Sequence, residues 1–192
     1  MPRRNNAEEK REAILNAFGL LLTQKMPDRI KLRELSEVSG VPYGSLHFFF
    51  KDKNEILLAY AERILNGYLE AAEQWSAHID TEIADFHTFY KAYLEFVESN
   101  FRYEREAQLG NYEHYFSVVH NSAALATFSA ELTGRYVEVL ADAIRRTRLE
   151  CKEPRKLACI LVALTDGIST LTQMDFPSGD RLELLRYFAE LI

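Results

Sequence analysis

Apolar side chains recur along this chain mostly at intervals of three and four residues, the spacing of one face of an α-helix. The strict alternation that predicts a β-strand is missing, as are the Asn-Gly and Asp-Gly turns typical of hairpins. The sequence therefore predicts an all-α protein. A first helix is expected from Asn6 to about Lys25, with one apolar face formed by Ile14, Leu15, Phe18, Leu21 and Leu22.

Two short helices and one long helix are expected next. Met26-Pro27-Asp28 ends the first helix, because proline disfavours helical geometry in the residue before it. Residues 32–39 and 43–49 form the short helices, and Gly40 supplies the turn between them. A long helix starts at Lys53, with Asp52 as its N-cap, and extends to the region of Trp75.

Longer helices are expected in the rest of the chain. Their ranges are 82–100 after a Thr81 cap, 122–150, 154–174 and a last helix capped by Ser178 or Asp180, with one or two shorter helices over 103–120. The pattern predicts a three-helix head over residues 1–52 and a helical body over residues 53–192.

Composition limits the protein class. The longest uninterrupted apolar run, Leu157 to Leu164, has eight residues, too few to cross a bilayer. The N-terminal residues do not resemble a secretion signal, and the two cysteines, Cys151 and Cys159, form no Cys-x-x-Cys motif. We therefore expect a cytoplasmic protein without a membrane segment, a disulfide framework or a structural metal.

Charge is distributed unevenly along the chain. The net charge is −6, but residues 1–53 hold ten Lys and Arg against seven Asp and Glu, a net of +3, and the remainder carries −9. Phosphate attraction is screened beyond about 8–10 Å in physiological salt, so a basic head can contact DNA despite an acidic body. A fluctuation in composition explains such a small excess equally well.

The head has the pattern of a helix-turn-helix, in which the second short helix enters the major groove. Tyr43, Gly44 and Ser45, at the start of that helix, offer small and polar groups to base edges or phosphates. An ordinary helical hairpin has the same periodicity, and the pattern alone leaves both interpretations open.

Three stretches make this pattern more specific. Residues 11–18 read REAILNAF, residues 35–46 read LSEVSGVPYGSL and residues 50–57 read FKDKNEIL. In this order and spacing they resemble the DNA-binding head of the TetR (tetracycline-repressor) family over about residues 9–58. The resemblance implies a three-helix head, a connecting fourth helix and a helical body that pairs two subunits.

The resemblance also implies roles for individual residues. Tyr43, Gly44 and Ser45 match positions that contact bases or the DNA backbone, and Lys53 matches a lysine that contacts a phosphate. Arg33 lies early in the second helix, where the family often reaches DNA, and His47 is expected to serve a phosphate. The chain departs from the family at three places: it has His47-Phe48-Phe49-Phe50 for a Tyr-His-Tyr-Phe-like run, Lys31 for a threonine cap, and Met26 for a glycine. These departures predict sparser operator contact, or contact led by the phenylalanines.

The sequence carries little that predicts catalysis. It contains neither the zinc-protease His-Glu-x-x-His pattern nor the glycine spacing of nucleotide cradles. Asp80, Glu82, Asp85 and His87 form the nearest approach to a metal cluster, but acids at a helix start are better explained by the helix dipole. We expect no enzyme activity, no cofactor and no bound metal.

Aromatic residues concentrate between Phe86 and Phe116, where ten of the 23 fall within 31 positions. Core packing explains aromatic residues at helical spacing. A ligand pocket is the alternative, because buried tyrosine hydroxyls need hydrogen-bonding partners that a bound molecule can supply. The expected ligand-binding residues are Phe89, Tyr90, Tyr93, Phe96, Tyr112, Tyr115 and Phe116.

Together these features predict a ligand-responsive DNA-binding transcriptional regulator, a repressor released from double-stranded operator DNA by a small apolar or aromatic effector. A helical ligand-binding protein or enzyme on the same fold, without operator binding, is the alternative. A homodimer is expected through the last two helices, because their apolar stripes exceed what one body need cover. The stripes are Leu157, Ile160, Leu161, Leu164, Ile168 and Leu171, and Leu182, Leu185 and Phe188.

Overall fold

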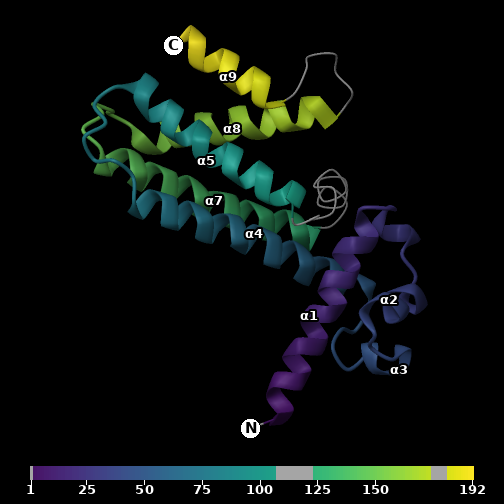
Figure 1. Cartoon of the computed structure of the whole chain (residues 1–192). Coiled ribbons are helices and arrows are strands. Elements are labelled where there is room, and N and C mark those ends of the chain that lie inside the picture. Colours follow the sequence, from purple (N-terminus) through teal and green to yellow (C-terminus); the bar gives the residue numbers. More distant parts are fainter. Residues whose placement is uncertain (1, 107–122, 174–180) are drawn as a thin grey trace. The chain divides into compact units, whose positions relative to one another are not determined.

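The structure is a computed structural model that describes residues 2–106, 123–173 and 181–192 (Figure 1). Helices make up its regular structure, and the described residues contain no strand, which confirms the all-α prediction. The elements are α1 (Pro2–Leu22), the 3-10 turn η1 (Pro27–Arg29), α2 (Leu32–Ser39), α3 (Tyr43–Leu46), α4 (Lys53–Ala77), α5 (Phe86–Glu106), α7 (Ala123–Arg146), α8 (Pro154–Gln173) and α9 (Arg181–Leu191).

Several predicted helix ends were wrong, and the clearest case is the start of α5. This helix begins at Phe86 and not at Glu82, because Asp85 is its cap in place of Thr81. The Asp85 Oδ1 atom accepts the Thr88 backbone N–H at 2.9 Å, and Asp85 Oδ2 accepts the Thr88 hydroxyl at 2.8 Å. Two acceptor oxygens at one position outcompete the hydroxyl of Thr81 as a cap.

Other ends also differ from the predicted ones. α1 ends at Leu22, before the predicted Lys25, and α7 ends at Arg146 instead of Glu150. α3 ends at Leu46, and the next three residues form a turn in which Phe49 N–H bonds the Leu46 carbonyl at 3.0 Å. The predicted caps Ser178 and Asp180, and most of the helices predicted over 103–120, lie outside the described residues.

The chain forms two compact units, each with its own core. We call them the head, Met1–Leu65 with Glu104–Phe128, and the body, Asn66–Tyr103 with Ser129–Ile192. The division falls inside α4, which supplies its first half to the head and its second half to the body. The sequence boundary at residue 53 coincides with the start of α4, and as a boundary between two functions it stays a prediction.

The core of the head is built around α1. All five residues predicted to form its apolar face are buried, and they pack with apolar side chains of α2, α3 and α4. Gly19 allows α1 to lie close to α4, since a Cβ atom at this position would come within 2.8 Å of the Tyr60 ring and hydroxyl. Arg63 joins the same two helices by bonding Glu12 Oε2 at 2.9 Å and Asn16 Oδ1 at 2.8 Å.

The turn between α2 and α3 depends on Gly40. Its φ of 68° lies in the left-handed region, which glycine enters without the cost that a Cβ atom imposes. Ser36 Oγ donates to the Val41 carbonyl at 2.7 Å, and the Val41 N–H donates to Ser39 Oγ at 3.2 Å. These bonds fix the angle at which α3 leaves α2.

Asp52 caps α4 as predicted. Its Oδ1 atom accepts the Glu55 N–H at 2.9 Å, and Glu55 Oε2 accepts the Lys51 N–H. This reciprocal pair satisfies backbone donors that the first turn of a helix leaves without partners.

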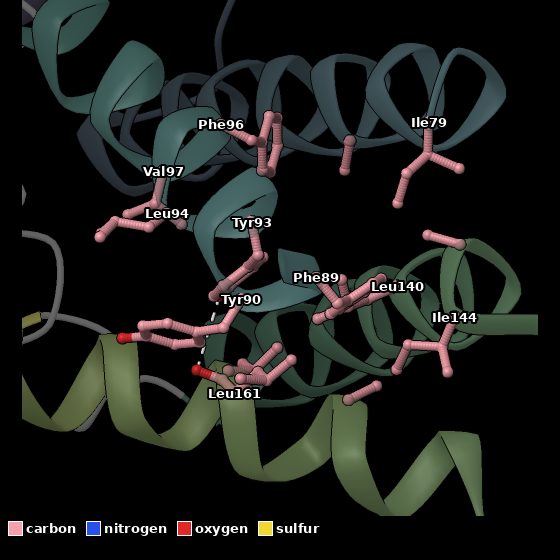
Figure 2. Packing of buried hydrophobic residues seen from close by; sticks show 14 of the residues in the cluster. Ile79, Phe89, Tyr90, Tyr93, Leu94, Phe96, Val97, Leu140, Ile144 and Leu161 are labelled. Carbon is pink, nitrogen blue, oxygen red and sulfur yellow. Dashed lines mark hydrogen bonds between the residues drawn. The ribbon is translucent and has the colours of Figure 1, made fainter. Parts of the chain in front are cut away.

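The core of the body combines side chains from the second half of α4 with α5, α7, α8 and α9. Figure 2 shows Phe89, Tyr90 and Tyr93 of α5 among Leu140 and Ile144 of α7 and Leu161 of α8. Trp75 of α4 completes the aromatic part of this core by stacking on Phe96, with ring centroids 5.0 Å apart and an interplanar angle of 22°. The described aromatic residues of α5 thus supply much of the packing between this helix and its neighbours.

Candidate functional site

The exposed face of the head carries the side chains predicted to contact DNA. Arg33, Tyr43, Gly44 and His47 are exposed, and Ser45 is half-buried. Leu46 lies on the opposite side of α3 and is buried in the head core. The helix-turn-helix therefore directs Leu35 and Leu46 inward and leaves the start of α3 open to solvent.

Tyr43 and Gly44 begin α3 next to free space. The Tyr43 ring contacts His47 edge to face, with centroids 6.2 Å apart. A Cβ atom added to Gly44 would have no heavy atom within 4 Å, so nothing in the described protein requires glycine there. This distinguishes Gly44 from Gly19, where the neighbouring ring leaves no room for a Cβ atom.

The three phenylalanines after His47 have different surroundings. Phe50 is buried in the head core beneath the Arg11 guanidinium, whose carbon lies 5.0 Å from the ring centroid, and Phe49 is half-buried. Phe48 is 86% exposed, more than any other large apolar residue among those described. With Tyr43, which is 46% exposed, it adds a second aromatic ring to the open surface beside α3.

Lys53 has a structural contact that its predicted role does not include. Its Nζ atom donates to the Asp28 carbonyl at 2.8 Å and to the Ile30 carbonyl at 3.3 Å. The ammonium thus ties η1 to the start of α4. A phosphate contact by Lys53 stays a prediction, and any test of it must account for these bonds.

The first turn of α2 is stabilised from outside the helix. Lys31, which replaces the threonine cap of the family, makes no side-chain capping bond. Glu34 pairs with Lys25, and this hydrogen bond holds the pKa of the Glu34 carboxyl below its usual value. Arg33 has no such pairing among the contacts recorded for the described residues, and its guanidinium faces solvent.

The predicted ligand-binding residues that the structure describes belong to the body core. Phe89, Tyr90, Tyr93 and Phe96 are all buried. The Tyr90 hydroxyl donates to the Leu185 carbonyl at 3.2 Å, and the Tyr93 hydroxyl lies 3.0 Å from Thr165 Oγ1. The Tyr93 hydroxyl also lies 3.5 Å from the Leu161 carbonyl (Figure 2). The protein itself therefore supplies the partners that were expected from a ligand.

Burial also changes the chemistry of these two hydroxyls. It raises the pKa of Tyr90 to about 12, and it raises the pKa of Tyr93 still further. Both phenols stay protonated at physiological pH and act as donors. Ligand contact by the four described residues stays a prediction, and the predicted Tyr112, Tyr115 and Phe116 lie outside the described residues.

The structure contains a cavity of about 380 Å³ that was not predicted from the sequence. It lies between the end of α4, the loop after it and the middle of α5, and its lining includes Phe96 but none of the other predicted ligand-binding residues. Most of its lining comes from the end of α4 and the loop after it, where the sequence shows no helical periodicity. Counting aromatic residues along the sequence therefore could not predict this cavity.

The apolar stripes predicted to form a dimer interface mostly face inward. Leu161 and Leu185 are buried, and Leu157, Leu164, Ile168, Leu182 and Phe188 pack against the body core. Leu171 is outside the residues whose side chains are described. Ile160 alone among the described members is largely exposed, at 63%. Most of these residues therefore contribute at least part of their surface to the body core, and a dimer interface on the last two helices stays a prediction.

A different apolar surface is exposed on the last two helices. Tyr187 and Leu191 of α9 are 58% and 65% exposed, and Ile192 is exposed after them. Spacing of four residues places Tyr187 and Leu191 on one side of α9. With Ile160 of α8 they are the described body residues with large apolar side chains open to solvent.

Solved structures share this arrangement over nearly the whole chain. A TetR-family transcriptional regulator from Streptomyces coelicolor superimposes with a TM-score of 0.61 at 22% identity, over 95% of this chain and 99% of that one. The TetR family repressor AlkX from Dietzia sp., implicated in biodegradation of n-alkanes, gives 0.54 at 18% identity, over 95% and 92%. The regulator FadR from Bacillus subtilis, solved with stearoyl-CoA, gives 0.62 at 14% identity, over 94% and 96%.

The chain has the TetR-family fold. This confirms the family resemblance of residues 9–58 at the level of fold. In sequence, the chain is 28% identical to the nucleoid occlusion factor SlmA of Glaesserella parasuis over 103 residues, which are 52% of this chain and about half (49%) of that protein. No family model matches the chain.

No described helix is long and apolar enough to span a membrane. The described His, Cys, Asp and Glu side chains form no group of three that could hold a metal ion. The acids once considered as a metal cluster have other roles: Asp85 caps α5, and Glu82 pairs with Arg148 at 2.7 Å.

Proposed function

We propose that this protein is a DNA-binding transcriptional regulator, which contacts operator DNA with α3 and the residues around it. The observation that carries the proposal is the exposed face of the head, where Tyr43, Gly44, His47 and Phe48 meet solvent while Leu46 and Phe50 are buried in the core. The net charge of +3 over residues 1–53 supports phosphate contact. The fold shared with TetR-family regulators adds to this support.

The direct test is a gel shift with DNA that flanks the gene. A retarded band that survives excess nonspecific DNA supports the proposal. Its absence, with a protein that is folded by circular dichroism, favours the alternative of a helical ligand-binding protein or enzyme without operator binding.

Gly44→Ala separates DNA contact from folding. A methyl group at this position meets no protein atom, so we expect unchanged stability together with weaker operator binding, because α3 can then no longer approach DNA as closely. An equal affinity of variant and wild type would place Gly44 away from the DNA.

Lys53→Ala tests the phosphate contact that the family resemblance implies. Removing one phosphate contact lowers the slope of log affinity against log salt by roughly one. Lys53 also ties η1 to α4, so the variant needs a parallel unfolding curve. Lys91→Ala, an exposed lysine of the body, is the matched control and should leave the slope unchanged.

We propose further that two copies of the chain pair through α8 and α9. Ile160, Tyr187 and Leu191 supply exposed apolar surface for this contact. A stable interface of this kind needs roughly 800 Å² from each partner. Ile160→Asp with Leu191→Asp should shift sedimentation from dimer to monomer, whereas Leu20→Asp, an exposed leucine of the head, should leave the dimer intact.

An effector that changes operator affinity completes the proposed function, in which the protein acts as a repressor. The body supports it, because α4 belongs to both units and its far end lines a cavity. A differential affinity of about 1–3 kcal/mol between the DNA-bound and free forms gives a 5- to 150-fold response. The protein named FadR, which shares the fold, was solved with stearoyl-CoA, so this fold accommodates a ligand in at least that protein.

A further inference from the structure

The cavity at the end of α4 has a chemistry of its own. Its volume of about 380 Å³ lies at the lower end of the range for small-molecule sites. All its lining residues belong to the body, and they combine an aromatic and aliphatic wall with a polar rim: Trp75, His78, Ile79, Asp80, Ile83, Ala92, Glu95 and Phe96.

The wall of the cavity is apolar and well ordered by its own packing. Trp75 and Phe96 stack on each other, and Trp75 also meets the edges of Phe89 and Tyr93 at centroid distances of 6.2 and 6.3 Å. Ile79 and Ile83 are buried beside them. This network fixes the Trp75 ring, which is half-buried and borders the cavity.

The rim presents hydrogen-bond acceptors and negative charge. Glu95 is exposed and forms no ion pair with any residue that the structure describes. Asp80 Oδ1 accepts the Glu82 N–H at 2.9 Å. The second carboxylate oxygen of Asp80 is not used in this bond. The lining includes no lysine or arginine, so neither carboxylate is neutralised within the cavity.

His78 adds to this acceptor character. Its Nδ1 atom lies 2.8 Å from the Gln74 carbonyl oxygen. A carbonyl oxygen only accepts, so Nδ1 carries the proton of the neutral ring and Nε2 keeps its lone pair. A neutral His78 therefore offers one more acceptor to the rim.

We propose that this cavity binds a small organic cation, an ammonium or quaternary ammonium group joined to a short apolar or flat portion. The cationic group lies by Glu95 and Asp80, and the apolar portion lies against Trp75 and Phe96, where the ring faces also attract positive charge. An anion is repelled by both carboxylates, and a neutral molecule gains only the apolar wall. Binding of the cation needs no DNA and does not depend on the proposed function. Only the role of this cation as the effector rests on the proposed function.

Trp75 reports binding directly, because it is the chain's only tryptophan. The probes are benzyltrimethylammonium, benzyl alcohol and phenylacetate, which share a ring and carry charges of plus one, zero and minus one. With excitation at 295 nm, we expect saturable quenching by the cation with a Kd of about 0.1–1 mM, and at least ten-fold weaker responses to the other two. Equal responses to all three probes, or none to the cation, would overturn the proposal.

Substitutions locate the site within the cavity. Glu95→Gln and Asp80→Asn should each weaken cation binding by roughly 3- to 10-fold and leave any response to benzyl alcohol unchanged. Asparagine at position 80 keeps an oxygen for the Glu82 N–H, so the local fold is preserved. Glu73→Gln, an exposed carboxylate two residues from Trp75 that does not line the cavity, is the matched control and should bind as the wild type does. Unchanged binding in the Glu95→Gln, Asp80→Asn double variant would also overturn the site.

A gel shift with the same cation separates this inference from the proposed function. Quenching by the cation in a protein that fails to retard any DNA supports the cavity and removes the regulator. Retarded DNA without quenching by the cation supports the regulator and overturns the cation site.

Discussion

The head and the body place their aromatic residues in opposite ways. In the head, Tyr43 and Phe48 are exposed on and beside α3. In the body, Phe89, Tyr90 and Tyr93 of α5 are buried, and the two tyrosine hydroxyls are hydrogen-bonded to the protein. Both groups were predicted to bind a partner. The difference shows that the spacing of a helix-turn-helix predicts which side chains face solvent. A concentration of aromatic residues predicts only that they pack together.

The largest expected change in stability that tests this contrast comes from removing an aromatic ring of the body. Tyr93→Ala should lower the free energy of unfolding by about 3–5 kcal/mol, because it opens a cavity in the core. Tyr43→Ala, the matched change in the head, should lie within about 0.5 kcal/mol of the wild type. Urea unfolding curves measure both, and a mild effect of Tyr93→Ala would mean that its surroundings are less tightly packed than described.

This expectation changes how a ligand contact at Tyr93 must be tested. An alanine variant that loses much of its stability cannot report on ligand binding alone. Tyr93→Phe keeps the ring and removes only the hydroxyl that bonds Thr165, so it is the variant to use in ligand titrations.

The next effect concerns two glycines of the head. Gly19→Ala should destabilise the protein by about 1–3 kcal/mol, because its new methyl group overlaps the Tyr60 ring and the packed helices have little room to separate. Gly44→Ala should change stability by less than about 0.5 kcal/mol. Thermal unfolding followed by circular dichroism distinguishes the two. Similar melting temperatures would contradict the close approach of α1 and α4.

Alkaline pH provides a third test, directed at the body. In the unfolded chain the Tyr90 phenol titrates near pH 10, and in the folded body burial raises its pKa to about 12. Its contribution to stability is therefore complete below pH 10 and is lost as the pH rises from 10 to 12. Absorbance at 295 nm should show Tyr90 and Tyr93 ionising late, together with unfolding, and Tyr90→Phe should move the alkaline transition upward.

The smallest expected effect concerns acid pH and the start of α5. The two hydrogen bonds from Thr88 hold the pKa of Asp85 below its usual 3.8. This contribution is present above pH 3.8 and is lost as the pH falls through the lowered pKa. Asp85→Asn keeps an acceptor for the cap and removes the titration. The variant should therefore lose less stability between pH 4 and pH 2 than the wild type, and a parallel loss in both would assign it to other carboxylates.

Much of the head could be predicted because its signals are local. The apolar face of α1, the Gly40 turn and the Asp52 cap each depend on a few neighbouring residues, and the structure contains all three. The same holds for the exposure of Tyr43 and Gly44, which follows from their place at the start of a helix whose Leu46 faces the core.

The body could be predicted as helices but not as a site. Which side of α8 faces inward depends on α5 and α9, which are distant from it in sequence. Sequence periodicity alone therefore did not show that most residues of the predicted dimer stripes pack against the body core. Tyr90 finds its acceptor 95 residues away at Leu185, a partner that no local pattern reveals. The cavity beside Trp75 likewise arises where α4 and α5 diverge, and its rim charges become meaningful only once that geometry is known.

The continuity of α4 has a consequence for engineering hybrids of this protein. A junction between Leu65 and Asn66, where the two cores divide, cuts a helix in its middle. Joining unrelated helical halves there must preserve both register and rotation, since each residue turns the helix by about 100°. A junction after residue 52 instead separates the first half of α4 from the α1 surface it covers. A segment that keeps α1 packed against α4 and includes the whole of α4 is residues 1–77. A hybrid built on this segment also inherits Trp75, the part of the donor's cavity wall that α4 supplies.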